Sequence, residues 1–162
     1  MLLSLKQKII DYVFTVSKQP ILLKDLLIAN SQYLEKLHVD PVKLGFRLKV
    51  ARAYLVYISL VILFTVPFTT ITHNLFANLD PHVSIIVAML LTAVIFIFFN
   101  FFRVWLVDQV ALSQIKKGWQ IHFPFFPYEE YNKKINEIFQ QSNKLELQKK
   151  DLQKYILDNL AE

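Results

Sequence analysis

The stretch VSIIVAMLLTAVIFIFFNFF, residues 83–102, decides the fold of this chain. It contains no Asp, Glu, Lys, Arg or His. A helix of roughly 20 apolar residues is what crosses about 30 Å of hydrocarbon. A second run, AYLVYISLVILFTVPFTTI at residues 53–71, has the same character. Because a buried core helix of a soluble protein seldom needs so long an uncharged run, the two runs predict two transmembrane spans.

The basic residues around these runs predict the orientation of the chain. All 18 Lys and Arg lie outside residues 53–102, nine before them and nine after them, and the loop between the runs has none. Lys and Arg accumulate on the cytoplasmic side of a membrane. We therefore expect an integral protein of an inner or plasma membrane, with both termini cytoplasmic and the loop outside. The runs begin too late in the chain for a signal peptide.

Composition narrows the fold and excludes several kinds of site. The chain has 162 residues, 54% of them hydrophobic, with a net charge of +5, no cysteine and only two glycines. Without cysteine there are no disulfides and no thiolate metal sites. The sequence lacks both a P-loop and a dinucleotide fingerprint. A chain so poor in glycine has few positions for left-handed turns, and an all-α fold is predicted.

Two Asp-Pro pairs, Asp40-Pro41 and Asp80-Pro81, suggest where the long helices begin. Proline is tolerated at the first position of a helix, and a preceding aspartate accepts a hydrogen bond from the first turn. The predicted organisation is cytoplasmic amphipathic helices in 1–40, a first long helix over 41–72 with its span at 53–71, an external loop at 73–80, a second long helix over 81–117 with its span at 83–102, and a cytoplasmic helical segment at 118–162. Gly118 is expected to end the second helix.

This organisation is a two-span antiparallel hairpin extended into a cytoplasmic helical bundle. Residues 3–17 and 21–37 have apolar side chains at helical spacing. We favour packing of both segments in the bundle, and the alternative is that the first lies flat on anionic lipid. The aromatic segment after Gly118 is expected to pack against cytoplasmic helices rather than lie in the membrane interface, through Trp119, Phe123 and Phe126.

The C-terminal segment, 127–160, is predicted to form one long helix or two with a break near residues 140–144. Apolar residues on it step by four and three, which is typical of a heptad seam. The seam consists of Tyr131, Ile135, Ile138, Leu145, Leu152 and Ile156, with polar positions at Ser142 and Lys149. It either packs on the chain's own bundle or forms a coiled coil with a partner or a second copy.

Four basic residues beside the first span are expected to lie near anionic lipid headgroups, where each gains about 1 kcal/mol. They are Lys43, Arg47, Lys49 and Arg52. Their position follows the positive-inside rule, so membrane lipid is the expected partner and nucleic acid is not indicated.

The spans contain no titratable side chain, although transporters usually keep at least one. Asn100 is expected to hydrogen-bond another helix or to reach the membrane interface. Ser84, Ala88 and Thr92 step by four, and small residues at this spacing let helices approach closely. They would serve packing of the hairpin on itself or association between copies.

The outer loop holds the weak candidates for a metal site: His73, Asp80 and His82. Imidazole and carboxylate groups suit zinc or copper, but Asp80 is already assigned as a helix cap. No metal and no cofactor are expected, and no arrangement of residues for catalysis emerges.

The leading hypothesis is a non-enzymatic membrane scaffold or accessory subunit that presents cytoplasmic helices to a partner or to copies of itself. The second is an oligomeric pore or channel of the holin or effector kind, which needs no charged residue in its spans.

Overall fold

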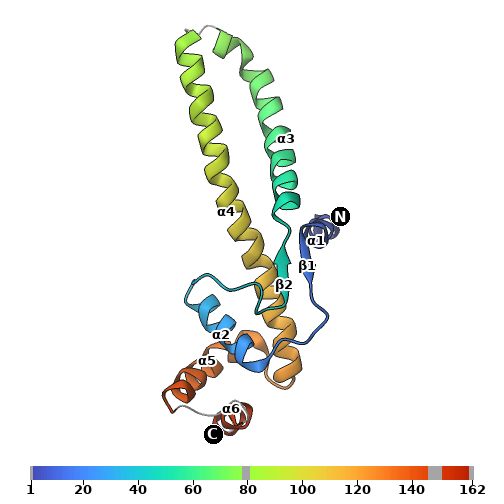
Figure 1. The fold of residues 1–162 in the computed structure, drawn as a ribbon, viewed down its shortest axis with the longest axis vertical. Coiled ribbons are helices and arrows are strands. Elements are labelled where there is room, and N and C mark those ends of the chain that lie inside the picture. Colours follow the sequence, from blue (N-terminus) through green and yellow to red (C-terminus); the bar gives the residue numbers. More distant parts are fainter. Residues whose placement is uncertain (1, 78–80, 146–150, 161–162) are drawn as a thin grey trace. The chain divides into compact units, whose positions relative to one another are not determined.

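A computed structural model of the chain describes residues 2–77, 81–145 and 151–160. These residues are mostly helical, which confirms the main expectation for the fold (Figure 1). The structure also contains a two-stranded sheet, which the sequence did not predict. The elements are α1 (Leu2–Val13), β1 (Phe14–Val16), α2 (Leu23–Leu34), β2 (Phe46–Leu48), α3 (Val50–Ala77), α4 (Pro81–His122), α5 (Tyr128–Lys144) and α6 (Leu152–Leu160).

The chain divides into two compact units. The apolar unit consists of Met1–Thr15 and Leu48–Val107, and the polar unit consists of Val16–Arg47 and Asp108–Glu162. The apolar unit contains α1, α3 and the first part of α4. The polar unit contains α2, the last part of α4, α5 and α6.

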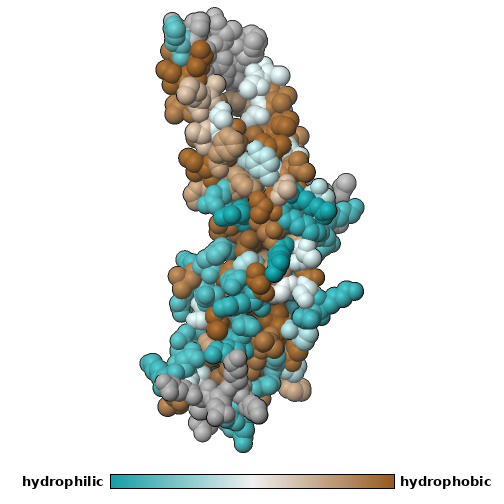
Figure 2. Space-filling model, viewed as in Figure 1, coloured by the Kyte–Doolittle hydropathy of each residue, from teal (hydrophilic) through white to brown (hydrophobic). Residues whose placement is uncertain are grey.

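Two long apolar helices dominate the apolar unit. Among the described residues, Val50–Ile71 and Ile85–His122 are long and apolar enough to cross a membrane. Figure 2 shows hydrophobic side chains gathered over α3 and the first part of α4. Hydroxyl groups on these helices bond to their own backbone, as when Thr65 Oγ1 donates to the Val61 carbonyl at 2.7 Å. The prediction of two helices with the length and composition of spans is thereby confirmed.

The first long helix begins at Val50, and the prediction that it begins at Pro41 is wrong. Asp40 Oδ1 accepts a hydrogen bond from the Val42 N–H at 3.0 Å, which stabilises a turn instead of a helix. Gly45 then adopts a φ of 71°, a left-handed conformation that a helix cannot contain. The chain continues into β2 before α3 starts.

The short sheet also ends the N-terminal helix earlier than predicted. α1 stops at Val13 rather than near residue 17, and β1 pairs with β2. The Lys49 N–H donates to the Val13 carbonyl at 2.8 Å and the Ser17 N–H donates to the Gly45 carbonyl at 2.6 Å. These two bonds run in opposite order along the two segments, so the strands are antiparallel. β-Branched and aromatic residues in β1 favour this extended backbone.

α4 begins at Pro81, as predicted, but it continues through Gly118 to His122. Gly118 is therefore not a helix stop. A Cβ built on it would lie 3.1 Å from Leu26 Cδ1 and 3.3 Å from Ile21 Cδ1, both of the polar unit. Glycine at this position allows α4 to approach the start of α2 closely. The cap assigned to Asp80 lies outside the described residues.

The polar unit has its own hydrophobic core. Trp119 and Phe123 are each 1% exposed, which confirms that this aromatic segment packs against helices. The C-terminal segment forms two helices, with the break after Lys144, close to where Ser142 and Asn143 predicted it. The buried core consists of Leu27, Trp119, Phe123, Ile135, Ile138, Phe139, Leu152, Ile156 and Leu160, and Phe126 packs against it.

Candidate functional site

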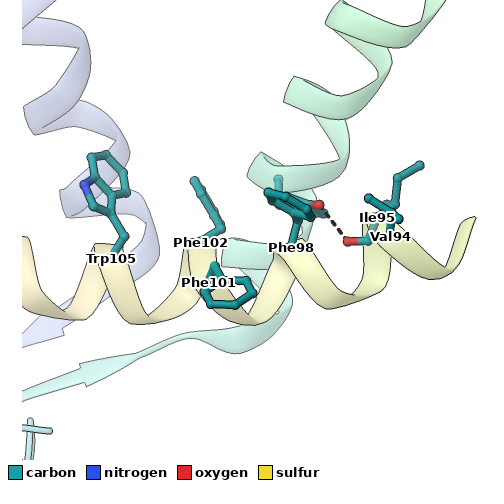
Figure 3. A pocket seen from close by; sticks show the side chains of 7 residues that line it. Val94, Ile95, Phe98, Phe101, Phe102 and Trp105 are labelled. Atoms are coloured by element: carbon teal, nitrogen blue, oxygen red, sulfur yellow. Dashed lines mark hydrogen bonds between the residues drawn. The ribbon is translucent and has the colours of Figure 1, made fainter. Parts of the chain in front are cut away.

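An apolar pocket of about 550 Å³ lies in the apolar unit. One α3 residue, Tyr57, and six α4 residues line it: Val94, Ile95, Phe98, Phe101, Phe102 and Trp105. Four of the six follow one another at steps of four, three and four, so helical geometry alone places them on one face of α4. Figure 3 shows the rings projecting from this stretch of the helix.

Tyr57 joins α3 to α4 at this pocket. Its hydroxyl donates to the Ile95 carbonyl at 2.6 Å, drawn as the dashed line in Figure 3. Its ring centroid lies 5.4 Å from that of Phe99 and 5.4 Å from that of Phe102. Tyr54 adds an edge-on contact to Phe99 at 5.3 Å. Such pairs contribute roughly 0.5–1.5 kcal/mol each beyond the area they bury.

The pocket has the chemistry of a hydrocarbon site. Apart from the bonded Tyr57 hydroxyl and the Trp105 indole N–H, its lining side chains carry no polar atom. No His, Asp, Glu, Lys or Cys lines it, and its Tyr57 hydroxyl is bonded to the Ile95 carbonyl. It suits an apolar group, such as an acyl chain.

The four basic residues predicted to lie near lipid are divided between the two units. Lys49 and Arg52 belong to the apolar unit, and Lys43 and Arg47 belong to the polar unit. Lys43 lines a second cavity, of about 320 Å³, together with residues around Ile21.

Arg52 connects α3 to α1. Its Nη1 donates to the Tyr12 carbonyl at 3.2 Å, and its guanidinium carbon lies 4.9 Å from the centroid of the Tyr12 ring. α1 therefore packs against α3 in the apolar unit. These contacts hold α1 at the start of α3 within the apolar unit, and packing of this helix in the cytoplasmic bundle stays a prediction.

The small-residue stripe on α4 is exposed at the two positions whose side chains the structure describes. Ala88 and Thr92 are exposed, and Thr92 Oγ1 donates to the Ala88 carbonyl of its own helix at 2.8 Å. The side chain of Ser84 lies outside the described residues. Asn100 is also exposed, and its Oδ1 accepts from Arg103 Nη2 at 3.0 Å. The predicted bond from Asn100 to another helix is thus replaced by a bond within α4.

The heptad seam lies inside the chain's own fold. Ile135 and Ile156 are fully buried, and Ile138 and Leu152 are each 6% exposed. Tyr131 packs against the same core. These side chains meet because α6 folds back on α5 after the break at Lys144. The seam as a surface for a partner is therefore a wrong assignment. Leu145 is exposed, Ser142 is buried, and Lys149 lies outside the described residues.

The residues proposed as weak metal ligands are not brought together in the part of the chain that the structure describes. His82 is exposed on α4, whereas the side chain of His73 and the whole of Asp80 lie outside the described residues. Among the described residues, no group of three or more His, Cys, Asp or Glu could hold a metal ion.

Polar contacts close the polar unit around the end of α4. Trp119 Nε1 donates to the Phe126 carbonyl at 2.8 Å and folds the connection to α5 back on the helix. His122 Nε2 lies 2.8 Å from the Ile21 carbonyl. Because a carbonyl only accepts, this nitrogen carries the proton. On the surface, Lys116 pairs with Glu129, and this hydrogen bond is the main cause that lowers the Glu129 pKa.

Burial raises the pKa of Tyr128 to about 12, with smaller contributions from Tyr33 and Glu129. Sequence reasoning assigned no polar or ring contact to this residue, to Tyr57 or to Tyr12. The aromatic spacing over residues 94–105 was a visible signal for the pocket. Nothing in the sequence marked the tyrosines of α1 and α3, because their roles depend on helices far away in the chain.

Comparison of the chain with models of known protein families, with curated proteins and with solved structures finds no match.

Proposed function

We propose that this chain is a non-enzymatic integral membrane protein, a scaffold or accessory subunit that holds its polar unit at the cytoplasmic face. In this proposal α3 and α4 cross the bilayer as an antiparallel hairpin, with both termini in the cytoplasm. The polar unit then contacts a protein partner or a second copy of the chain.

One observation carries the proposal: the long helices of the apolar unit expose large apolar side chains, whereas the polar unit buries such side chains in a core. In the apolar unit, large side chains along α3 and α4 are exposed, such as Leu63 at 65% and Met89 at 68%. In the polar unit, side chains of the same kind are buried in a core. Exposing apolar area to water costs about 25 cal/mol per Å². Lipid around α3 and α4 removes that cost. The exposure of these apolar side chains therefore supports a membrane location for α3 and α4 only.

Orientation rests on the distribution of charge. Lys and Arg flank both apolar runs on the sides away from the connecting loop, and cytoplasmic segments carry the excess of these residues. A tag inserted between residues 72 and 82 of the full chain should react with reagents from outside the cell only. A tag that reacts from the cytosol would reject the hairpin.

The seam is buried, so the partner surface is expected elsewhere on the polar unit. Ile121 and Phe125 are the strongest candidates, because they are four residues apart and are 61% and 88% exposed. They lie at the end of α4 and in the connection to α5. Depletion of charge and enrichment of aromatic residues are typical of the centre of a protein interface.

Crosslinking in native membranes tests this proposal. The chain has no cysteine, so a Phe125→Cys variant carries a single reactive thiol, and Gln120→Cys is a matched exposed control on α4. A short bifunctional crosslinker should give a discrete adduct from position 125 and much less from position 120. A chain that remains a monomer without stable neighbours after mild detergent extraction would overturn the scaffold.

A second candidate, an oligomeric pore, is favoured by the exposed stripe on α4. Ala88 and Thr92 are not covered by α3, so they remain open to close approach by a helix of another copy. Purified chain in liposomes should then release an entrapped dye, and Ala88→Leu should abolish the release. Liposomes that retain the dye at high protein density would reject the pore.

A further inference from the structure

We propose that α1 and the first turn of α3 form an interfacial anchor that binds the anionic phospholipid headgroups of the bilayer. This inference rests on the proposed function in one respect, since it requires that α3 enters the membrane.

The position of α1 beside the start of α3 is the first support. Val13, the last residue of α1, accepts a hydrogen bond from the Lys49 N–H, and α3 begins at the next residue, Val50. Arg52 bonds to the Tyr12 carbonyl and covers the Tyr12 ring. The apolar run that could cross a membrane starts at the same Val50. A helix tied to the first turn of a span lies at the depth of the headgroups.

The second support is the amphipathic character of α1. Its C-terminal end is anchored, since Val13 is fully buried and Phe14 is 3% exposed. Toward the N-terminus of α1, Ile9 and Ile10 are half-buried, whereas the charged residues Lys6 and Lys8 are exposed. At helical spacing Lys8 lies opposite Ile9, Ile10 and Val13, whereas Lys6 lies one turn before Ile10 at the end of the apolar side. An apolar helix face bordered by lysines is typical of segments that lie in the plane of an interface. Lysine stems can also cover apolar surface while the ammonium groups reach the headgroups.

Charge complementarity identifies the occupant. The apolar unit carries five Lys and Arg against two Asp. Four of the five basic residues lie in α1 or around the start of α3: Lys6, Lys8, Lys49 and Arg52. Each basic group near an anionic membrane surface strengthens binding about fivefold. Anionic lipid is favoured over an acidic protein because the surface adjoins the proposed entry of α3 into hydrocarbon.

A fluorescence experiment on the full chain in lipid nanodiscs tests the anchor. The chain is free of cysteine, so Gln7→Cys places one environment-sensitive label between the two exposed lysines of α1. A quencher attached to lipid headgroups should quench this label strongly in nanodiscs that contain anionic phosphatidylglycerol. Quenching should be much weaker in nanodiscs of zwitterionic phosphatidylcholine and should fall as salt increases.

Paired variants separate the anchor from a general effect of charge. The double variant Lys6→Gln, Lys8→Gln should weaken the interfacial equilibrium of α1 roughly 25-fold, from about fivefold for each lysine. Lys133→Gln, Lys134→Gln removes the same charge from exposed positions of α5 and should leave quenching unchanged. Equal quenching in the two lipids, or an equal loss in the two double variants, would overturn the inference.

The same samples distinguish this failure from failure of the proposed function. Resistance to alkaline extraction and labelling of the outer loop report whether α3 and α4 span the bilayer. A chain that is integrated and correctly oriented, but whose label at position 7 ignores anionic lipid, refutes the anchor alone. A chain that is extracted as a soluble protein refutes both.

Discussion

Replacing Trp119 tests whether the core of the polar unit is built as described. The Trp119 side chain is 1% exposed, and its ring centroid lies 5.0 Å from that of Phe123. Removing a fully buried tryptophan side chain as alanine costs about 3–5 kcal/mol. The Trp119→Phe variant keeps a ring in the core but leaves the Phe126 carbonyl without its 2.8 Å donor. An unsatisfied buried acceptor costs about 1–3 kcal/mol, so this variant should be less damaging.

A buried thiol measures these costs in the full chain. Ser142 is 1% exposed and close in size to cysteine, so Ser142→Cys in this cysteine-free chain reacts only when the polar unit opens. A factor of ten in reactivity corresponds to about 1.4 kcal/mol. Thiol labelling in mild detergent should therefore accelerate by roughly two to four powers of ten for Trp119→Ala and one to two for Trp119→Phe.

The control is Trp105→Ala, because Trp105 belongs to the apolar unit and is 51% exposed. This variant should leave labelling at position 142 unchanged. If Trp119→Ala changes the labelling rate less than threefold, Trp119 does not stabilise the core, and the reasoning about the polar unit is refuted.

Three further predictions concern α5 and its surroundings. Ile135→Ala should lower the free energy of unfolding by about 2–5 kcal/mol, whereas Leu145→Ala, at an exposed position, should stay within about 0.5 kcal/mol in urea titrations; equal effects would argue that the seam is not internal. Pairing with Lys116 lowers the Glu129 pKa in the folded state, so its stabilisation is present above the unfolded pKa and is lost as the pH falls through the folded pKa. Glu129→Gln should thus destabilise slightly at neutral pH and not in acid, and a difference that persists in acid contradicts the pairing. The Tyr128 pKa of about 12 means that burial stabilises the neutral phenol, so this contribution is present below pH 10 and is lost as the pH rises through 12; ultraviolet titration should show one late tyrosine that Tyr128→Phe removes.

The local pattern of the sequence was enough to predict most of the helices and the two apolar spans. Residues 53–71 and 83–102 are uncharged over the length of a span, and this property needs no knowledge of other segments. The start of α4 at Pro81 and the break after Lys144 also followed from local residue preferences. Such features depend on neighbours a few positions away, which a sequence shows directly.

The start of α3 and the role of Gly118 were decided by contacts between distant segments. Asp40-Pro41 has the residues of a helix cap, yet β2 pairs with β1 thirty residues earlier, and the strand displaces the helix. Glycine often follows the end of a helix, but Gly118 lies within α4. Leu26 approaches it so closely that a larger side chain has little room there. Local preference is a weak term that tertiary contacts override.

The sequence by itself determined that α5 and α6 each have an apolar face. Periodic spacing places Ile135 on the apolar side of α5 and Ile156 on the apolar side of α6. Only the tertiary structure decided what covers that face. α6 packs on α5, and both side chains become fully buried within the chain. The physical reason is that removing apolar area from water lowers the free energy, whichever surface covers that area. Periodicity therefore predicts that a helix face is buried, and the path of the chain determines which segment covers it.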